Sequence, residues 1–213
     1  MAIAFNSANQ QVNASSTNTI SLACSGSDRL VIACVADDAK GTMSVTYNGT
    51  SLTSIANVED TSGFFKLHFF YLLNPATGTN NLVATRGTNS GDFYLFGATY
   101  TGIKQTGQPD ASTTNAQTSG TTQTTSLTTI ANNSWSILFT SADSGGLAAS
   151  TNSTLRGSIL NGFSGLFDSN SAITPAGSFS MSTTMNSGLR TAIMVSFSPS
   201  ASSTNTSNFF NFF

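Results

Sequence analysis

Side chains able to do acid–base or nucleophilic chemistry are few in this chain. It contains one histidine, His68, and one glutamate, Glu59, and only 8% of its 213 residues are charged. Catalytic sites usually combine such groups at tuned pKa values, and no carboxylate or nucleophile lies near His68 in sequence. A catalytic base at His68 is one interpretation, but its place between Leu67 and Phe69 favours a packed, structural histidine. We therefore expect no catalytic residues and no enzymatic activity.

Acidic residues cluster where loops are expected. Asp37-Asp38 follows an apolar segment, Glu59-Asp60 lies in a polar one, and Asp110 follows a proline. Such carboxylates could bind Ca²⁺, which prefers oxygen ligands, or could face each other across a cleft as in glycosidases. Their spacing fits no ligand loop, and solvated strand ends are the favoured interpretation. We predict no metal and no cofactor.

The two cysteines, Cys24 and Cys34, could pair with each other. If residues 25–28 turn a hairpin, Cys24 lies opposite Arg29, so a disulfide would need a bulge or a link between sheets. Two buried thiols are the favoured interpretation, since free cysteine is among the most buried residue types. Whether the cysteines pair stays open at this point.

Charge and hydropathy exclude some partners. The formal net charge is −2, and the seven Lys and Arg are spread along the chain, which argues against nucleic acid or an anionic membrane as partner. Residues 1–6 have neither the positive nor the apolar region of a signal peptide. The longest apolar run, 64–73, is too short to span a bilayer. We expect a chain made in the cytosol, or a mature form.

Period-two patterning with turn residues recurs along the chain. Residues 30–36 are apolar on both faces, as a strand between two layers should be, and Asn48-Gly49 is a strong hairpin signal. Gly162-Phe163-Ser164-Gly165 lacks the context of a phosphate loop and is interpreted as a turn. No segment has the period of an amphipathic helix. The pattern predicts an all-β fold, an antiparallel two-sheet β-sandwich of jelly-roll type.

Composition divides the chain into a body and two extensions. We expect an extended N-terminal arm at 1–18, a single sandwich domain at 19–198, and a C-terminal tail at 199–213. Within the domain, 105–125 is almost purely Gln, Thr, Ser, Gly and Asn. It is therefore expected to be a long connection, an arm or an edge strand.

The tail carries the strongest signal for a partner. It ends in four phenylalanines, Phe209, Phe210, Phe212 and Phe213, after a polar linker. Left in water, each would forgo roughly 1.5–3 kcal/mol of burial. They could fold back onto the domain, or dock on another subunit or protein, which is the favoured interpretation.

Other aromatic side chains could serve as contacts on the body. Most lie on the apolar side of alternating strands and are expected in the core. Phe64, Phe70 and Phe93 lie on the opposite faces and could contact a partner, including a glycan. Neighbouring strands could equally cover those faces.

From Leu30 to Ile103 the order of elements resembles a β-sandwich module of tailed-phage virion proteins and bacterial surface proteins. The similarity lies in the buried strand 30–36, the hairpin 45–53, and the segments 70–78 and 97–103. Such modules occur in phage decoration proteins, in fibres and in carbohydrate-binding surface domains. The motifs are structural, so the resemblance implies no catalytic residues.

The resemblance and the tail together lead to a functional hypothesis. We expect a non-enzymatic structural protein of a phage-like particle, a capsid decoration (cement) protein or a fibre or knob subunit. Its partners would be copies of itself, with a trimer favoured by analogy, and other virion proteins such as a major capsid protein. Its location would be the virion. The alternative is a carbohydrate-binding adhesion module, and a glycan-cleaving enzyme is a third hypothesis of lower weight.

Overall fold

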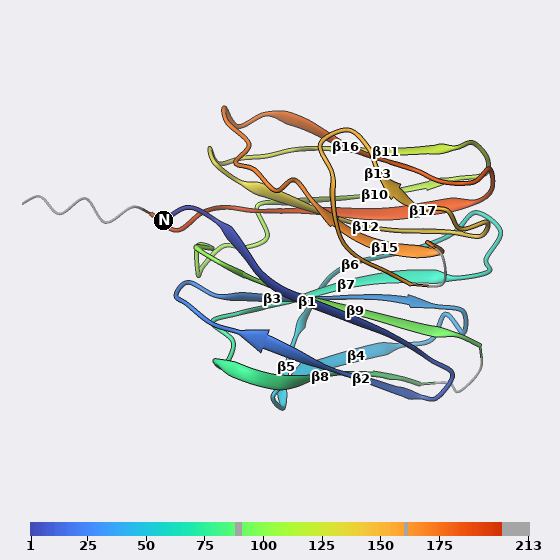
Figure 1. The fold of residues 1–213 in the computed structure, drawn as a ribbon, viewed down its shortest axis with the longest axis horizontal. Helices are drawn as coiled ribbons and strands as arrows, with labels where there is room; N and C mark the ends of the chain where they lie inside the picture. The colour runs from blue at the N-terminus through green and yellow to red at the C-terminus, as the bar shows by residue number, and fades with distance from the viewer. Residues whose placement is uncertain (88–90, 160–161, 202–213) are drawn as a thin grey trace, which may run out of the picture.

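Alternating apolar and polar residues give a structure built from antiparallel strands. The computed structural model describes residues 1–87, 91–159 and 162–201. These residues form four sheets stacked one above another (Figure 1). In this part of the chain, no helix is long and apolar enough to cross a membrane. The prediction of an all-β antiparallel sandwich is confirmed, but the described residues form four sheets rather than the two expected.

The first half of the chain forms two of the sheets. The inner sheet has the order β1-β9-β3-β7-β6 and the outer sheet the order β2-β8-β4-β5. Strands that follow each other in sequence mostly alternate between the two sheets, which is the connectivity of a jelly roll. The strands are β1 (Ala4–Asn13), β2 (Thr17–Cys24), β3 (Leu30–Asp37), β4 (Met43–Tyr47), β5 (Thr50–Ser51), β6 (Thr53–Glu59), β7 (Lys66–Leu73), β8 (Gly78–Arg86) and β9 (Phe93–Thr101).

The second half of the chain forms the other two sheets. Its inner sheet has the order β10-β17-β12-β15-β14 and its outer sheet the order β11-β16-β13. The strands are β10 (Ala111–Gln117), β11 (Thr122–Thr128), β12 (Trp135–Ala142), β13 (Ala148–Ala149), β14 (Thr154–Ile159), β15 (Ser164–Asp168), β16 (Ser178–Thr184) and β17 (Arg190–Phe197).

The two halves repeat one strand order. When β1 is matched to β10, β3 to β12 and β9 to β17, both inner sheets have the same succession of neighbours, and the outer sheets match likewise. β1 contacts β14 and β6 contacts β10, as expected if a half-turn about an axis along the strands relates the halves. The sequence analysis treated this region as one domain and did not predict the repeat.

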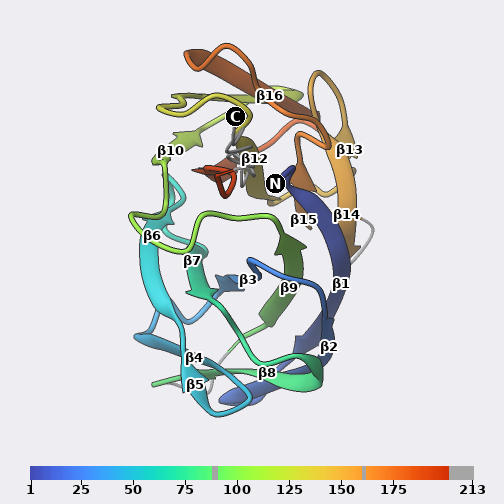
Figure 2. The ribbon, with the colours of Figure 1, turned by 90° about the vertical axis from the view of Figure 1, so that its left-hand side faces the viewer.

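Three apolar layers fill the spaces between the four sheets. The first outer core lies between the sheets of the first half and includes Tyr47 and Phe93. The central core joins the two inner sheets and includes Phe96 and Phe139, whose ring centroids lie 5.3 Å apart. The second outer core lies between the sheets of the second half. Figure 2 shows the four sheets that enclose these cores, viewed along the strands.

The inner strands are apolar on both faces because each face packs on a different core. In β3, residues 30, 32, 34 and 36 belong to the central core, and residues 31, 33 and 35 to the first outer core. Every residue of β12 and β17 is likewise buried. A continuous apolar run, rather than alternation, is what such a position requires.

Two polar segments, the expected arm 1–18 and the connection 105–125, belong to the sheets of the sandwich. β1 pairs with β9 along its whole length, so most of the expected N-terminal arm, 1–18, is an edge strand of its own inner sheet. The segment expected as an extended arm is therefore part of the sandwich itself. The connection 105–125 contains β10 and the start of β11, both edge strands. The four tail phenylalanines lie outside the described residues.

Candidate ligand pocket

The single histidine is buried in β7. Its ring stacks on that of Phe70, with centroids 6.2 Å apart and planes at 16°. Burial, aided by the charge of Lys66, lowers the pKa of His68 to about 4. The Nε2 atom has no hydrogen-bond partner among the described residues. The side chain is therefore neutral at pH 7 and packs within the sheet, as the sequence analysis favoured.

Asp37 is part of a buried ion pair that fixes the loop after β3. Its Oδ1 lies 2.8 Å from Arg86 Nη1, and both side chains are 0% exposed. The same carboxylate accepts hydrogen bonds from the backbone N–H groups of Ala39 and Gly41. Arg86 also donates to the carbonyl of Gly91. All these bonds lie within the protein, so this carboxylate is structural.

Two more of the predicted acidic positions bind backbone groups. Asp60 accepts hydrogen bonds from the N–H groups of Ser62 and Phe65, which closes the turn before β7. Asp110 accepts from the N–H of Ile130 and from the hydroxyl of Ser198. Within the described ranges, no three His, Cys, Asp or Glu side chains are grouped as a metal site would require.

The two cysteines are free and lie on opposite sides of the inner sheet. Cys24 belongs to the first outer core and Cys34 to the central core. Burial raises the pKa of both thiols. The interpretation as two buried thiols is confirmed.

Only one of the three aromatic residues expected on the surface is there. The Phe64 side chain is 66% exposed, whereas Phe70 is 4% and Phe93 is 0% exposed. Phe70 and Phe93 point away from the central core, as expected, but the outer sheet covers that face. The prediction that they are available to a partner is wrong because a further layer packs on them.

Phe64 lies at a pocket of about 410 Å³ between the two halves, which we call the junction pocket. Three other aromatic residues, Phe65, Tyr94 and Phe163, also line it. Phe163 is 37% exposed and belongs to the segment interpreted only as a turn. Phe64 precedes β7 and Phe163 precedes β15, which are corresponding strands of the two halves. Sequence reasoning missed Phe163 because the repeat was not recognised.

Two aspartates line the junction pocket at equivalent positions. Asp38 directly follows β3, and Asp143 directly follows the corresponding strand β12. A recurring aspartate after a buried apolar strand was the signal that could have revealed Asp143. The Asp143 carboxylate accepts no hydrogen bond from the described residues, and Asp38 accepts only the N–H of Asp92, at 3.3 Å. Both side chains are exposed and free to contact a ligand.

The pocket is electrostatically negative. Partial shielding from solvent raises the pKa of Asp38, and the carboxylates of Asp92 and Asp37 raise it further. Tyr94 donates its hydroxyl to Asp92 Oδ2 at 3.0 Å. Burial and this hydrogen bond raise the pKa of Tyr94, so its hydroxyl stays protonated.

Hydroxyl groups lie at the bottom of the junction pocket. Ser141 and Ser164 line it, and their Oγ atoms lie 2.6 Å apart. Thr191 is paired directly with Ser141 across β12 and β17, so its side chain lies on the same face of the sheet. The pocket thus has an aromatic wall, two carboxylates, and serine hydroxyl groups at its bottom.

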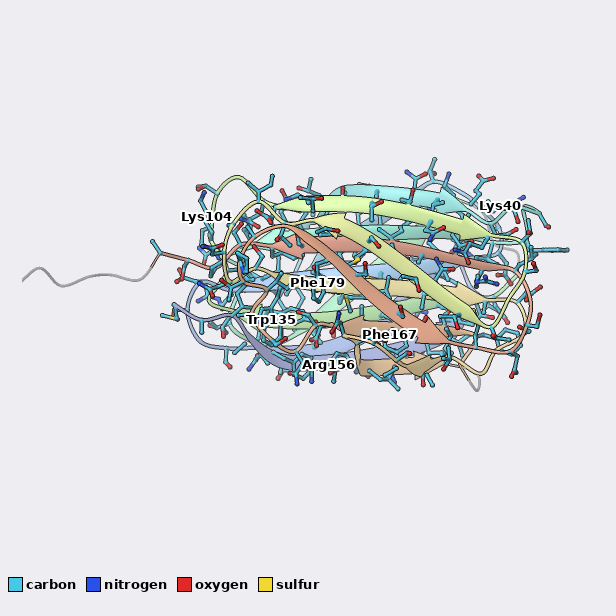
Figure 3. The ribbon with its side chains drawn as sticks, turned by 90° about the horizontal axis from the view of Figure 1, so that it is seen from above. Lys40, Lys104, Trp135, Arg156, Phe167 and Phe179 are labelled. Carbon is cyan, nitrogen blue, oxygen red and sulfur yellow. The ribbon has the colours of Figure 1, made fainter. Side chains whose placement is uncertain are left out.

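A second and larger pocket, of about 780 Å³, lies at the opposite end of the molecule. We call it the tail-end pocket. Ile3, Trp135 and Pro199 supply apolar walls, and Lys104 and Ala201 also line it. Figure 3 shows Lys104 and Lys40 at opposite ends of the molecule. Lys40 is near the junction pocket, because its Nζ donates to the carbonyl of Gly63, the neighbour of Phe64. The last described residue, Ala201, therefore lies at the tail-end pocket.

No known protein family and no curated protein matches the chain.

Proposed function

We propose that this protein is a non-enzymatic structural subunit of a phage-like particle, either a capsid decoration (cement) protein or a fibre or knob subunit. In this role it forms homo-oligomers, with a trimer favoured by analogy, and contacts other virion proteins such as a major capsid protein. Its location is the virion.

One observation carries the proposal: two jelly rolls are joined into one body by a continuous apolar core. Jelly rolls are common in capsid and lectin domains, and the fold alone does not choose between them. The chemistry of the chain favours a capsid-type role over a lectin-type role. His68 is neutral and packed, and Asp37, Asp60 and Asp110 fix loops. A surface poor in charge also suits large packed interfaces, which are depleted in Lys and Glu.

The tail supplies the contact in this mechanism. Phe209, Phe210, Phe212 and Phe213 follow a polar linker that starts at the tail-end pocket. A linker of this kind lets the aromatic side chains reach a neighbouring subunit. The edge strands of the sheets offer further main-chain groups for pairing.

The oligomeric state of three chains tests this mechanism. The full chain, a chain without residues 208–213, and a chain with the four tail phenylalanines changed to serine are compared by sedimentation velocity. We expect the full chain to be oligomeric and both altered chains to be monomeric. Phe64→Ser, at the opposite end, is the control and should leave the oligomer intact. A full chain that remains monomeric at every concentration would contradict the proposal.

The carbohydrate-binding alternative depended on three aromatic residues, of which only Phe64 is exposed. Glycoside binding at the junction pocket is one of the outcomes measured in the experiment below.

A further inference from the structure

The junction pocket has features that the structural role proposed above does not require. It combines exposed aromatic rings with two carboxylates that accept at most one hydrogen bond from the described residues. Its volume, about 410 Å³, lies within the range of roughly 300–1,000 Å³ typical of small-molecule sites. The pocket is therefore large enough to hold a small organic group.

Exposing the aromatic side chains of the pocket to water is unfavourable in free energy. Phe64 is two-thirds exposed and Phe163 more than one-third, while Phe65 and Tyr94 form the wall between the halves. Exposed rings gathered at a pocket are a common mark of a binding site. Their faces carry negative electrostatic potential, which attracts cations.

The charges around the pocket select against an anion. Asp38 and Asp143 line it, and neither is paired with a basic side chain among the described residues. Arg86 is engaged by Asp37, and Lys40 Nζ donates to the carbonyl of Gly63. Lys40 therefore offsets part of the negative charge but leaves an excess of carboxylate.

A buried hydroxyl group lies on the neighbouring strand, opposite one residue that lines the pocket. Thr191 is 0% exposed, and its Oγ1 has no hydrogen-bond partner among the described residues. Its side chain lies on the same face as Ser141, which lines the pocket. Buried hydroxyls normally have a partner, so the strand pair next to the pocket keeps one unused hydrogen-bonding group, although Thr191 itself does not line the pocket.

We propose that the junction pocket binds an alkylammonium group, with its carbon atoms against Phe64 and Phe163 and its positive charge beside Asp38 and Asp143. Aromatic rings and carboxylates together are the usual receptor for such cations. Two sources share this chemistry: a trimethylated headgroup such as choline, and a primary amine such as the end of a lysine side chain.

Ligand titrations of the full chain test the proposal. Choline and n-butylammonium are added separately, and the aromatic resonances of the protein are followed by NMR. The neutral carbon isostere of choline, 3,3-dimethylbutan-1-ol, shows whether charge is needed. We expect at least one of the two cations to bind, more tightly than the isostere, and its affinity to fall as salt is added. The cation that binds more tightly identifies whether the pocket takes a trimethylated headgroup or a primary amine.

Matched substitutions locate the site. Phe64→Ala should weaken binding about tenfold, the range of one partly desolvated cation–π contact. Ile130→Ala, which removes an even more exposed apolar side chain elsewhere, should have no effect. Asp143→Asn should weaken binding, whereas Asp28→Asn, in the turn between β2 and β3, should not. All four positions are at the surface or in turns, so the variants should fold.

Three outcomes would overturn the inference. Equal affinity for choline and its neutral isostere would show that charge is not recognised. Binding of methyl glycosides in place of either cation would make the pocket a carbohydrate site. Cation binding that survives both Phe64→Ala and Asp143→Asn would place the site elsewhere. None of these results depends on the oligomeric state, so the structural proposal is tested separately.

Discussion

Single residues show how a chain with few charges uses them. The Asp37–Arg86 pair is fully buried, and it is held by further hydrogen bonds to the loops after β3 and before β9. A buried ion pair adds little to the free energy of unfolding when it is compared with a pair of apolar residues in the same place. Removing one partner is different, because it leaves the other charge buried and unpaired.

Asp37→Asn should therefore lower the free energy of unfolding by about 3–5 kcal/mol. Glu59→Gln is the matched control, since Glu59 pairs with Lys66 at the surface, where such pairs contribute about 0–1 kcal/mol. Urea denaturation of both variants measures the difference. Equal effects of the two substitutions would show that the Asp37–Arg86 pair is not the buried anchor described here.

His68 makes stability depend on pH in a defined window. Its pKa is about 4 in the folded protein and 6.5 as the unperturbed value, so the unfolded chain binds more protons between these pH values. The contribution of His68 to stability should thus be constant above pH 6.5 and be lost progressively as pH drops toward 4. The loss due to His68 should reach about 3 kcal/mol.

The change His68→Gln isolates this contribution from that of the carboxylates. The variant should lose less stability than the unsubstituted chain between pH 6.5 and 4, as measured by urea denaturation at each pH. Parallel pH profiles for the two proteins would contradict the assignment of a neutral, buried histidine.

At the scale of the strands, close packing of the sheets requires small residues at particular positions. A Cβ atom on Gly97, in the middle of β9, would lie 2.6 Å from Leu82 Cδ2 and 3.1 Å from Ile20 Cδ1 and Leu22 Cδ2. Gly97→Ala should therefore cost about 1–3 kcal/mol by overpacking the first outer core.

Gly157→Ala, in β14, is the control for this prediction. Its Cβ would meet the end of the flexible Gln10 side chain, which can move away. Its effect on the thermal midpoint should be clearly smaller than that of Gly97→Ala. A larger shift for the Gly157 variant would mean that the sheets of the first half are less tightly packed than described.

The edge strands show why part of the fold escaped prediction. β1 contains mainly Asn, Gln, Ser and Ala, so it lacks the apolar alternation that identifies strands. Its position is set by main-chain pairing with β9 and by side-chain amides. Asn9 donates to the carbonyl of Ser21, and Asn18 donates to that of Gln11. Such hydrogen bonds depend on which strands lie side by side in the folded chain, so the sequence pattern does not reveal them.

For the whole molecule, the central core makes the two halves one unit. Phe96 and Phe139 meet across the halves, and Tyr100 donates its hydroxyl to Asp168 of the other half. Separating the halves would expose the apolar face of each inner sheet. We therefore expect the two jelly rolls to unfold together.

Urea denaturation followed by two probes tests this cooperativity. Far-UV circular dichroism reports on all sheets, whereas fluorescence of Trp135, the only tryptophan, reports on the central core, where it packs on Tyr100 of the first half. The two curves should coincide. Phe139→Leu should shift both curves equally to lower urea, and separate transitions would show that the halves unfold independently.

The pattern of apolar residues determined, by itself, that the chain folds as antiparallel strands. It also identified the buried strand β3, the hairpin after β4 and the packed histidine. These features follow from local rules, because side chains alternate along a strand and an apolar run needs cover on both faces. The exposed position of Phe64 was predicted for the same reason.

Only the tertiary structure decided how many layers there are and what each face meets. Phe70 and Phe93 are buried because an outer sheet covers them, and Asp38 and Asp143 share a pocket because the two halves pack inner sheet to inner sheet. Sequence periodicity states that a face is apolar, but it does not state which distant segment covers it. That choice depends on long-range packing between strands far apart in the chain.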